Sequence, residues 1–146
     1  DLRALVDSAV ERFGGVDIVV NNSATALAQL IEDITPEAWQ KVFDVNLRGP
    51  VLLVQAALPH LRASEHGSVI NVVSVGAFLF STYTSMYASA KAGLLSYTRS
   101  MAAELAPDGI RVNALAPGTV DTDMVRANPP EAQARMVRAG VGRSRS

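Results

Sequence analysis

The stretch GSVINVVS, residues 67–74, decides the fold class of this chain. Its β-branched residues, bounded by a glycine and a serine, predict a strand buried in a sheet. A helical pattern from about Thr84 to Ala106 follows it, and residues 108–118, DGIRVNALAPG, predict a turn and another strand. A strand, a long helix and a strand in this order predict two parallel strands joined by a crossover helix.

The same alternation extends toward the start of the chain. Residues 1–15, DLRALVDSAVERFGG, have apolar residues at helical spacing and a glycine pair as a stop. Residues 16–24, VDIVVNNSA, predict a strand buried on both faces of a sheet. A long helical region then runs to about Ala63, with Thr35 as N-cap and Pro36 at its first position, and it is interrupted near NLRGP. The whole pattern predicts an α/β fold with a parallel sheet and helices on both faces.

Small and polar residues follow each predicted strand. In open α/β sheets ligands bind beyond the carboxyl ends of the strands, so these residues are the first candidates for a site. They are Asn21, Asn22, Ser23 and Ala24 after the first strand, Ser74 after the second, and Pro117, Gly118 and Thr119 after the third.

Composition narrows the function classes. The net charge of −1 over 146 residues offers no basic surface for nucleic acid, and the absence of cysteine excludes disulfides and thiolate metal sites. The longest apolar runs are too short to span a bilayer, and no signal peptide is visible. We therefore expect a cytoplasmic protein with no metal site, no nucleic-acid partner and no membrane association.

Tyr87 and Lys91 are the first candidates for catalysis. Four residues along a helix place two side chains on nearly the same face. A cation near a phenol favours the phenolate and lowers its pKa from about 10, which suits the tyrosine to exchange protons with an alcohol or a carbonyl oxygen. The alternative is a chance pair in which the lysine side chain extends to water.

Ser74 and Asn46 have two interpretations each. Ser74 could hold a substrate oxygen near Tyr87, or it could satisfy a backbone group at the strand end. Pro50 has no N–H for the carbonyl of Asn46, so a continuous helix should kink there and could present that carbonyl to a water. Alternatively, Gly49 and Pro50 begin a new helix.

Several motifs together resemble the short-chain dehydrogenase/reductase family. They are NNSA after a strand, VNLRG in a helix, a serine thirteen residues before the tyrosine, YASAK, and LAPDGIRVNALAPGTVDTDM. Their order and spacing cover roughly residues 15–124. The resemblance implies a Rossmann-type fold and reversible hydride transfer between NAD or NADP and a small alcohol or carbonyl substrate.

The resemblance also implies roles for individual residues. The catalytic set would be Asn46, Ser74, Tyr87 and Lys91, with Tyr87 as acid/base, Lys91 on the nicotinamide ribose, Ser74 on the substrate oxygen, and the Asn46 carbonyl on a relay water. The cofactor set would be Asn21, Asn22, Ser23, Ala24, Tyr87, Lys91, Pro117, Gly118, Val120 and Thr122. Relatives of this kind form homodimers or homotetramers, so we expect one of these assemblies.

Two departures from the family pattern concern the cofactor. The segment after the first strand has Ser23 and Ala24 where the family has Ala and Gly, and alanine adopts fewer backbone conformations than glycine. The ten glycines never form the Gly-rich turn that holds a pyrophosphate. We therefore expect residues 1–146 to be the central part of one NAD(P)-binding Rossmann domain of about 250 residues, without its first strands and its last strand. Residues 119–146 would be a mobile substrate lid and tail, with a short helix near 130–138.

Two other functions fit the same motifs. A truncated, non-catalytic subunit or interaction module would explain the missing phosphate turn, and the retained Asn, Ser, Tyr and Lys set argues for the enzyme. A nucleotide-sugar epimerase shares the Tyr-x-x-x-Lys motif, but the NNSA and PGTVDT segments favour the dehydrogenase. The apolar segment VGAFLFSTYTSM, residues 75–86, would line the pocket and favours a partly hydrophobic substrate.

Overall fold

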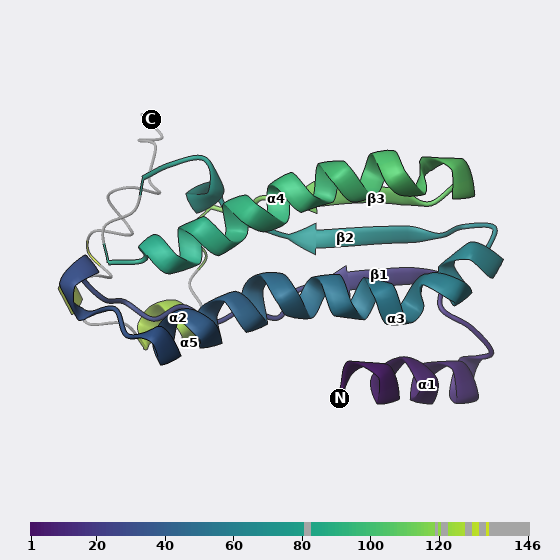
Figure 1. Ribbon diagram of the computed structural model, residues 1–146, viewed down its shortest axis with the longest axis horizontal. Coiled ribbons are helices and arrows are strands. Elements are labelled where there is room, and N and C mark those ends of the chain that lie inside the picture. Colours follow the sequence, from purple (N-terminus) through teal and green to yellow (C-terminus); the bar gives the residue numbers. More distant parts are fainter. Residues whose placement is uncertain (81–82, 119, 121–122, 128–129, 132–133, 135–146) are drawn as a thin grey trace, which may run out of the picture.

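A three-stranded parallel sheet forms the centre of the molecule (Figure 1). The computed structural model describes residues 1–80, 83–118, 120, 123–127, 130–131 and 134. The strands are β1 (Ile18–Asn21), β2 (Ser68–Val72) and β3 (Arg111–Leu115), and they lie side by side in the order β1-β2-β3. The predicted α/β fold with a parallel sheet is therefore confirmed.

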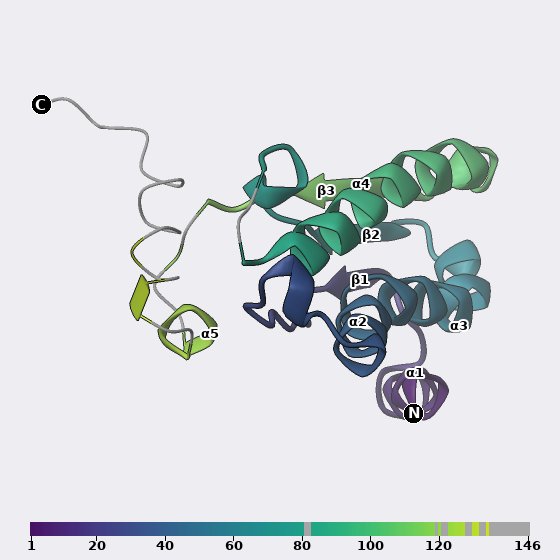
Figure 2. The same cartoon turned by 60° about the vertical axis from the view of Figure 1, so that its left-hand side comes forward.

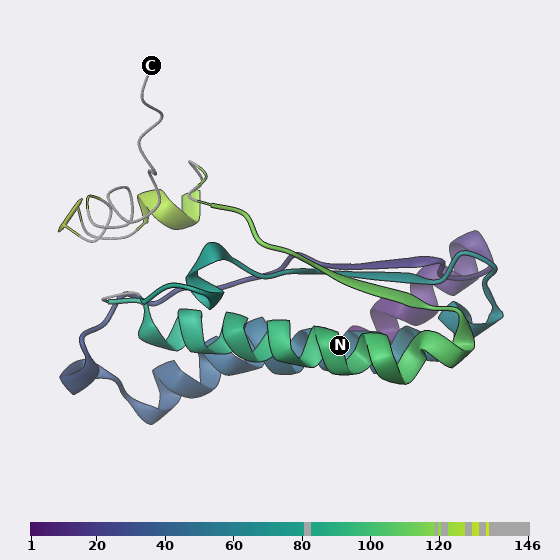
Figure 3. The ribbon, with the colours of Figure 1, turned by 90° about the horizontal axis from the view of Figure 1, so that it is seen from above.

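The helices of the described residues alternate with these strands. They are α1 (Leu2–Phe13), α2 (Pro36–Phe43), the π-helix η2 (Asp44–Arg48), α3 (Gly49–Ala63), α4 (Ser85–Leu105) and α5 (Asp123–Arg126). Short 3-10 turns are η1 (Ile31–Asp33), η3 (Val75–Ala77) and η4 (Ala106–Asp108). Figure 3 shows α3 and α4 as a layer on one face of the sheet, and α1 packs against α3. None of the helices in the described part of the chain is long and apolar enough to cross a membrane.

The predicted helix ends are confirmed. Gly14 follows α1 with a φ of 85°, the left-handed conformation that glycine adopts without strain, and its N–H donates to the carbonyl of Val10. The Thr35 hydroxyl accepts a hydrogen bond of 3.1 Å from the N–H of Ala38, and Pro36 is the first residue of α2. These short-range signals are sufficient to fix where α1 ends and where α2 begins.

The predicted interruption near NLRGP is a π-helical turn. The backbone stays right-handed helical from α2 through Asp44–Arg48 into α3, so a new helix does not begin at Gly49. The N–H of Gly49 donates to the carbonyl of Asp44, five residues back rather than four. The α-helical partner of the Asn46 carbonyl would be Pro50, which has no N–H, and the wider turn accommodates this loss.

The sequence predicts strands that are buried on both faces of the sheet. In the described residues only one face of the sheet is buried. Val19, Val69 and Val112 are in register across the three strands and are buried in the main core. Ile18 and Val20 of β1 are 59% and 53% exposed. The main core comprises Val6, Val19, Val54, Ala57, Leu61, Val69, Met101, Leu105, Ile110 and Val112.

The C-terminal predictions fall mostly outside the described residues. This applies to Thr119, to Thr122, to most of the predicted helix near 130–138, and to most of the lid and tail at 119–146. Within the described part, α5 covers Asp123–Arg126.

Candidate active site

Three predicted site residues come from two neighbouring elements at the carboxyl end of β2. Ser74 follows β2 and is the N-cap of η3, and Tyr87 lies in the first turn of α4, one turn before Lys91. Turn η3 packs against α4. Figure 2 shows the N-terminal parts of α2 and α4 side by side at this end of the sheet, where a second buried cluster of Val42, Met86 and Ala90 supports them.

Tyr87 is linked to Ser74 by a side-chain hydrogen bond. The Ser74 hydroxyl also accepts a bond of 3.1 Å from the N–H of Gly76, so it satisfies a backbone group as one interpretation expected, and its contact with a substrate oxygen stays a prediction. Burial raises the pKa of Tyr87 above its ordinary value of 10.0, and the hydrogen bond from Ser74 opposes this in part. The phenol is therefore protonated at neutral pH.

Lys91 is almost completely buried, with 1% of its surface exposed. Its Nζ donates a hydrogen bond of 2.7 Å to the carbonyl of Val72 and lies 5.8 Å from the ring centroid of Tyr87. Burial lowers the pKa of the ammonium from 10.5 to about 8. The shared helix face is confirmed, and the interpretation as a lysine that extends to water is wrong.

The predicted lowering of the Tyr87 pKa is wrong for this structure. Removal of water from the phenol disfavours its anion, and this effect exceeds the one hydrogen bond that favours the anion. The Lys91 ammonium bonds to the strand rather than to the phenolic oxygen, which limits what its charge can do for Tyr87.

Asn46 is fully buried at the π-helical turn and holds the loop that follows β1. Its Oδ1 accepts from the N–H of Thr25 at 3.0 Å, and its Nδ2 donates to the carbonyl of Thr25 at 2.7 Å. The side chain of Asn46 thus has a structural role that the sequence did not predict, and its carbonyl remains the predicted group for a water.

The predicted cofactor segment after β1 divides into a buried and an exposed part. Asn21 is buried, and its amide donates to Asn71 in the neighbouring strand at 2.7 Å, which ties β1 to β2. Asn22 and Ser23 are exposed, and Ala24 is half-buried. The exposed pair is therefore the part of this segment that a ligand can reach.

The segment after β3 runs next to Ser74. The N–H of Val75 donates to the carbonyl of Pro117 at 3.0 Å, and Gly118 is exposed with open space where a side chain would begin. Val120 is exposed, whereas Thr122 lies outside the described residues. Pro117 is thus brought to the candidate site, while Gly118 and Val120 are accessible from solvent.

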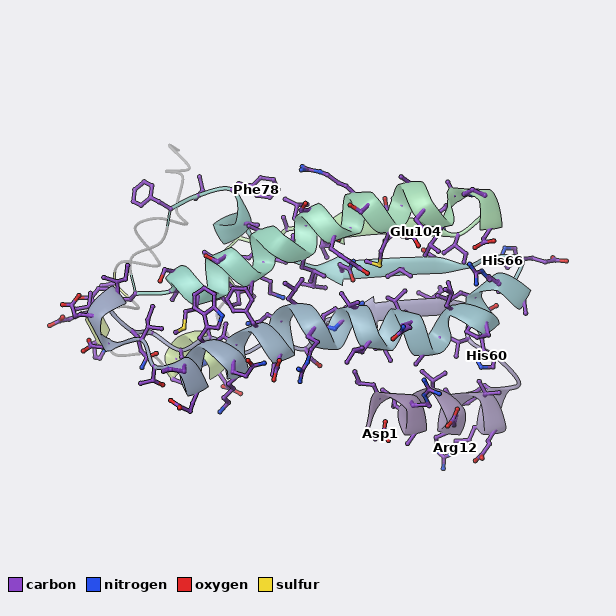
Figure 4. The ribbon with its side chains drawn as sticks, viewed as in Figure 1. Asp1, Arg12, His60, His66, Phe78 and Glu104 are labelled. Atoms are coloured by element: carbon purple, nitrogen blue, oxygen red, sulfur yellow. The ribbon has the colours of Figure 1, made fainter. Side chains whose placement is uncertain are left out.

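Apolar side chains extend from the loop between Ser74 and Tyr87. Phe78, Leu79 and Phe80 are exposed, and Phe80 is 93% exposed. Figure 4 shows Phe78 beyond the carboxyl ends of the strands, and it shows His60 and His66 at the opposite end of the sheet. Phe78 therefore lies at the end of the sheet that carries the candidate site, and the two histidines do not.

Two polar residues that the sequence analysis did not single out are buried beneath this site. Asn71 of β2 donates from Nδ2 to the hydroxyl of Thr98 in α4 at 2.9 Å, and both side chains are buried. A signal was present in the sequence, because an asparagine inside an otherwise apolar strand requires a buried partner. The partner is 27 residues away, so only the fold identifies it.

The donors at the site fit the ribose of a nicotinamide cofactor. An ammonium has three N–H donors, and among the described residues the hydrogen bond of Lys91 goes to the carbonyl of Val72. Two donors remain for hydroxyl groups. A Gly-rich turn for the pyrophosphate is absent from the 146-residue sequence, so these residues fit the nicotinamide side of a cofactor and not its phosphates.

Comparison with known proteins agrees with the motifs. A family model described as short chain dehydrogenase matches residues 1–133. The probable galactose dehydrogenase GalD of Rhizobium meliloti is 39% identical over 125 residues, which are 86% of this chain and 49% of that protein. The human dehydrogenase/reductase SDR family member 4 is 42% identical over 127 residues, which are 86% of this chain and 46% of that protein.

A solved structure shows the same fold at similar coverage. The gluconate 5-dehydrogenase from Burkholderia cenocepacia, in complex with NADP and tartrate, superimposes with a TM-score of 0.82 at 35% identity. The match covers 86% of this chain and 49% of that chain. The chain thus spans about half the length of the relatives it matches.

Proposed function

Since the chain belongs to the short-chain dehydrogenase family, we propose that the whole protein is an NAD- or NADP-dependent oxidoreductase that interconverts an alcohol and a ketone or aldehyde. The observation that carries the proposal is the hydrogen bond between Tyr87 and Ser74, with the buried Lys91 one helical turn away. A hydroxyl pair of this kind can hold a carbonyl oxygen and deliver a proton to it.

The cofactor, when bound, supplies or accepts the hydride. Lys91 and Tyr87 would hold its ribose, because both side chains carry hydrogen-bond donors and lie beside the carboxyl end of β2. Residues Asn22, Ser23 and Gly118 are exposed at neighbouring strand ends and would contact other parts of the cofactor. The relative that was solved with NADP supports a nicotinamide cofactor, and the proposal includes both NAD and NADP.

The protonation state of Tyr87 favours the reducing direction near neutral pH. A phenol with a raised pKa carries the proton that the new alcohol oxygen requires, whereas oxidation requires the phenolate first. Ser74 would hold the carbonyl oxygen, and the proton would pass from Tyr87 to that oxygen as the hydride reaches the carbon. The Asn46 carbonyl would hold the water that returns a proton to the phenol.

The Tyr87→Phe variant tests the acid/base role in the whole protein. Its kcat/KM for a panel of ketones and aldehydes with NADH and NADPH should fall by about 100-fold or more, because a positioned acid contributes on that scale. Binding of the reduced cofactor, followed by fluorescence, should change little. Tyr97→Phe alters an exposed tyrosine on the same helix and should retain turnover. Equal loss in both variants, or none in Tyr87→Phe, would contradict the proposal.

The non-catalytic subunit of the sequence analysis is the second candidate. Titration of the whole protein with NADH and NADPH distinguishes the two: binding of either supports the enzyme, and binding of neither supports the subunit. We also propose a homodimer or homotetramer. Exposed apolar side chains on α3 and α4, Leu52 and Tyr97, support a contact between copies, and light scattering gives the assembly mass.

A further inference from the structure

A chain of buried hydrogen bonds crosses the molecule beneath the candidate active site. Asn21 Nδ2 donates to Asn71 Oδ1 at 2.7 Å, and Asn71 Nδ2 donates to Thr98 Oγ1 at 2.9 Å. The Thr98 hydroxyl donates its hydrogen to the carbonyl of Leu94 at 2.7 Å. It can therefore act toward Asn71 only as an acceptor. The donors and acceptors of these hydrogen bonds therefore follow one direction, from β1 through β2 to α4.

Burial of apolar surface does not require this series of hydrogen bonds. Asn71 is 0% exposed and Thr98 is 4% exposed, and apolar side chains of similar shape in both places would pack without the cost of removing amide and hydroxyl groups from water. Buried polar pairs differ from apolar contacts in their directionality, because a small displacement breaks them. The Asn71–Thr98 bond thus contributes what the apolar contacts do not: it fixes the position of α4 along β2.

A second bond holds α4 against the same part of β2. Lys91 Nζ donates to the carbonyl of Val72, the residue next to Asn71. Lys91 and Thr98 are seven residues apart, which is about 10 Å along the helix and about two turns, so both lie on one face. Two bonds from distant turns of α4 therefore converge on consecutive residues of one strand, so a shift of α4 in one direction stretches one bond and a shift in the other direction stretches the other.

The other contacts of α4 resist such a shift less well. Its apolar residues Ala90, Leu94 and Met101 are buried, and apolar contacts tolerate small rearrangements at modest cost. Tyr87 lies eleven residues before Thr98, about three turns, so it is on the same face as the two anchors. A shift of α4 by 1 Å would move Tyr87 from Ser74 by a similar distance, which can cost about 100-fold in rate.

We propose that Asn71 and Thr98 are positioning residues, whose hydrogen bond fixes α4 along β2 and so holds Tyr87 beside Ser74. The inference rests on the proposed function for its kinetic readout, and it has a second readout that needs no substrate.

The kinetic experiment uses Thr98→Val in the whole protein. Valine keeps the shape of threonine and removes the acceptor, so kcat should fall by about 10-fold to 100-fold while KM for the carbonyl changes less than about threefold. Thr98→Ser keeps the hydroxyl and should restore most of kcat. Met101→Ala, one turn later on α4, destabilises the core without touching the anchors and should keep kcat once folded. If Thr98→Val does not fold, Thr98→Cys, whose thiol is a weak acceptor, replaces it.

The second readout is the titration of Tyr87, followed by the NMR shift of its labelled ring carbon and assigned with Tyr87→Phe. In Thr98→Val the phenol should become better hydrated, so its pKa should fall from its raised value toward that of an exposed tyrosine. Met101→Ala should leave the titration unchanged. An unchanged kcat and titration in Thr98→Val, or equal effects in Thr98→Ser, would overturn the proposal. An inactive wild type contradicts the proposed function instead, and the titration still decides this inference.

Discussion

The buried Lys91 should make the free energy of unfolding increase with pH. Its pKa is about 8 in the folded chain, whereas the ordinary pKa of an exposed lysine is 10.5. Between these values the unfolded chain binds the proton and the folded chain has released it. Because the unfolded state then binds more protons, stability increases as pH rises. The contribution is fully present above 10.5 and is lost as pH falls through about 8.

The size of this effect follows from the two pKa values. A difference of about 2.5 units corresponds to about 3 kcal/mol in total. Most of this change in the free energy of unfolding falls in a pH range that is easy to measure, since stability should rise by about 2 kcal/mol between pH 7 and pH 9.5. Tyr87 opposes the rise only above its ordinary pKa of 10.0, because its folded pKa is raised and its contribution is lost at high pH.

The assay is urea unfolding without cofactor at several pH values from 7 to 9.5. Lys91→Met removes the titrating group, so its stability should lack this rise of about 2 kcal/mol. The chain offers one matched control, Lys41→Met, since Lys41 is the other lysine and is exposed on α2. It should follow the wild type. Parallel curves for wild type and Lys91→Met would show that the buried ammonium does not titrate in this range, and the reasoning would fail.

Two further substitutions test the packing around the site elements. Gly67→Ala should lower the free energy of unfolding, measured in urea, by about 1–3 kcal/mol, because the added Cβ would lie 2.7 Å from the carbonyl oxygen of Leu61. The control is Gly15→Ala, which should have a much smaller effect because the space at that position is open. Equal losses in the two variants would contradict this prediction. Asn46→Ala should cost about 2–3 kcal/mol, because the backbone of Thr25 loses both of its partly buried bonds to this side chain. A loss below about 0.5 kcal/mol by thermal unfolding would show that water replaces the amide.

The sequence predicted features that depend on neighbours along the chain. The end of α1 at Gly14 and the start of α2 at Thr35 and Pro36 were identified because capping acts within a few residues. The irregular turn before Pro50 was identified for the same reason, since a missing N–H affects a carbonyl four residues away. Its form as a continuous π-helix required the structure, because packing decides whether a helix breaks or widens.

The candidate site could be predicted only in part. The shared face of Tyr87 and Lys91 follows from helix geometry, and the structure confirms it. The direction of the Tyr87 pKa shift could not be predicted from the sequence, because it depends on how much water the fold removes from the phenol. The link between Asn71 and Thr98 was also missed, since it joins two ordinary residues that come together only when α4 packs on the sheet.

The π-helical turn at Asp44–Arg48 sets the rotational phase between α2 and α3. Each residue of an α-helix rotates by about 100°, so Val42 and Leu61, nineteen residues apart, would point about 100° away from each other in an unbroken α-helix. The wider turn absorbs about one residue and returns the two side chains to one side. Val42 can therefore pack against Met86 and Ala90 below the catalytic candidates while Leu61 packs in the main core. Deletion of one residue in this turn would leave Val42 and Leu61 eighteen residues apart, a spacing that an ordinary α-helix also places on one side, so the wide turn would be lost while both helices keep their orientation.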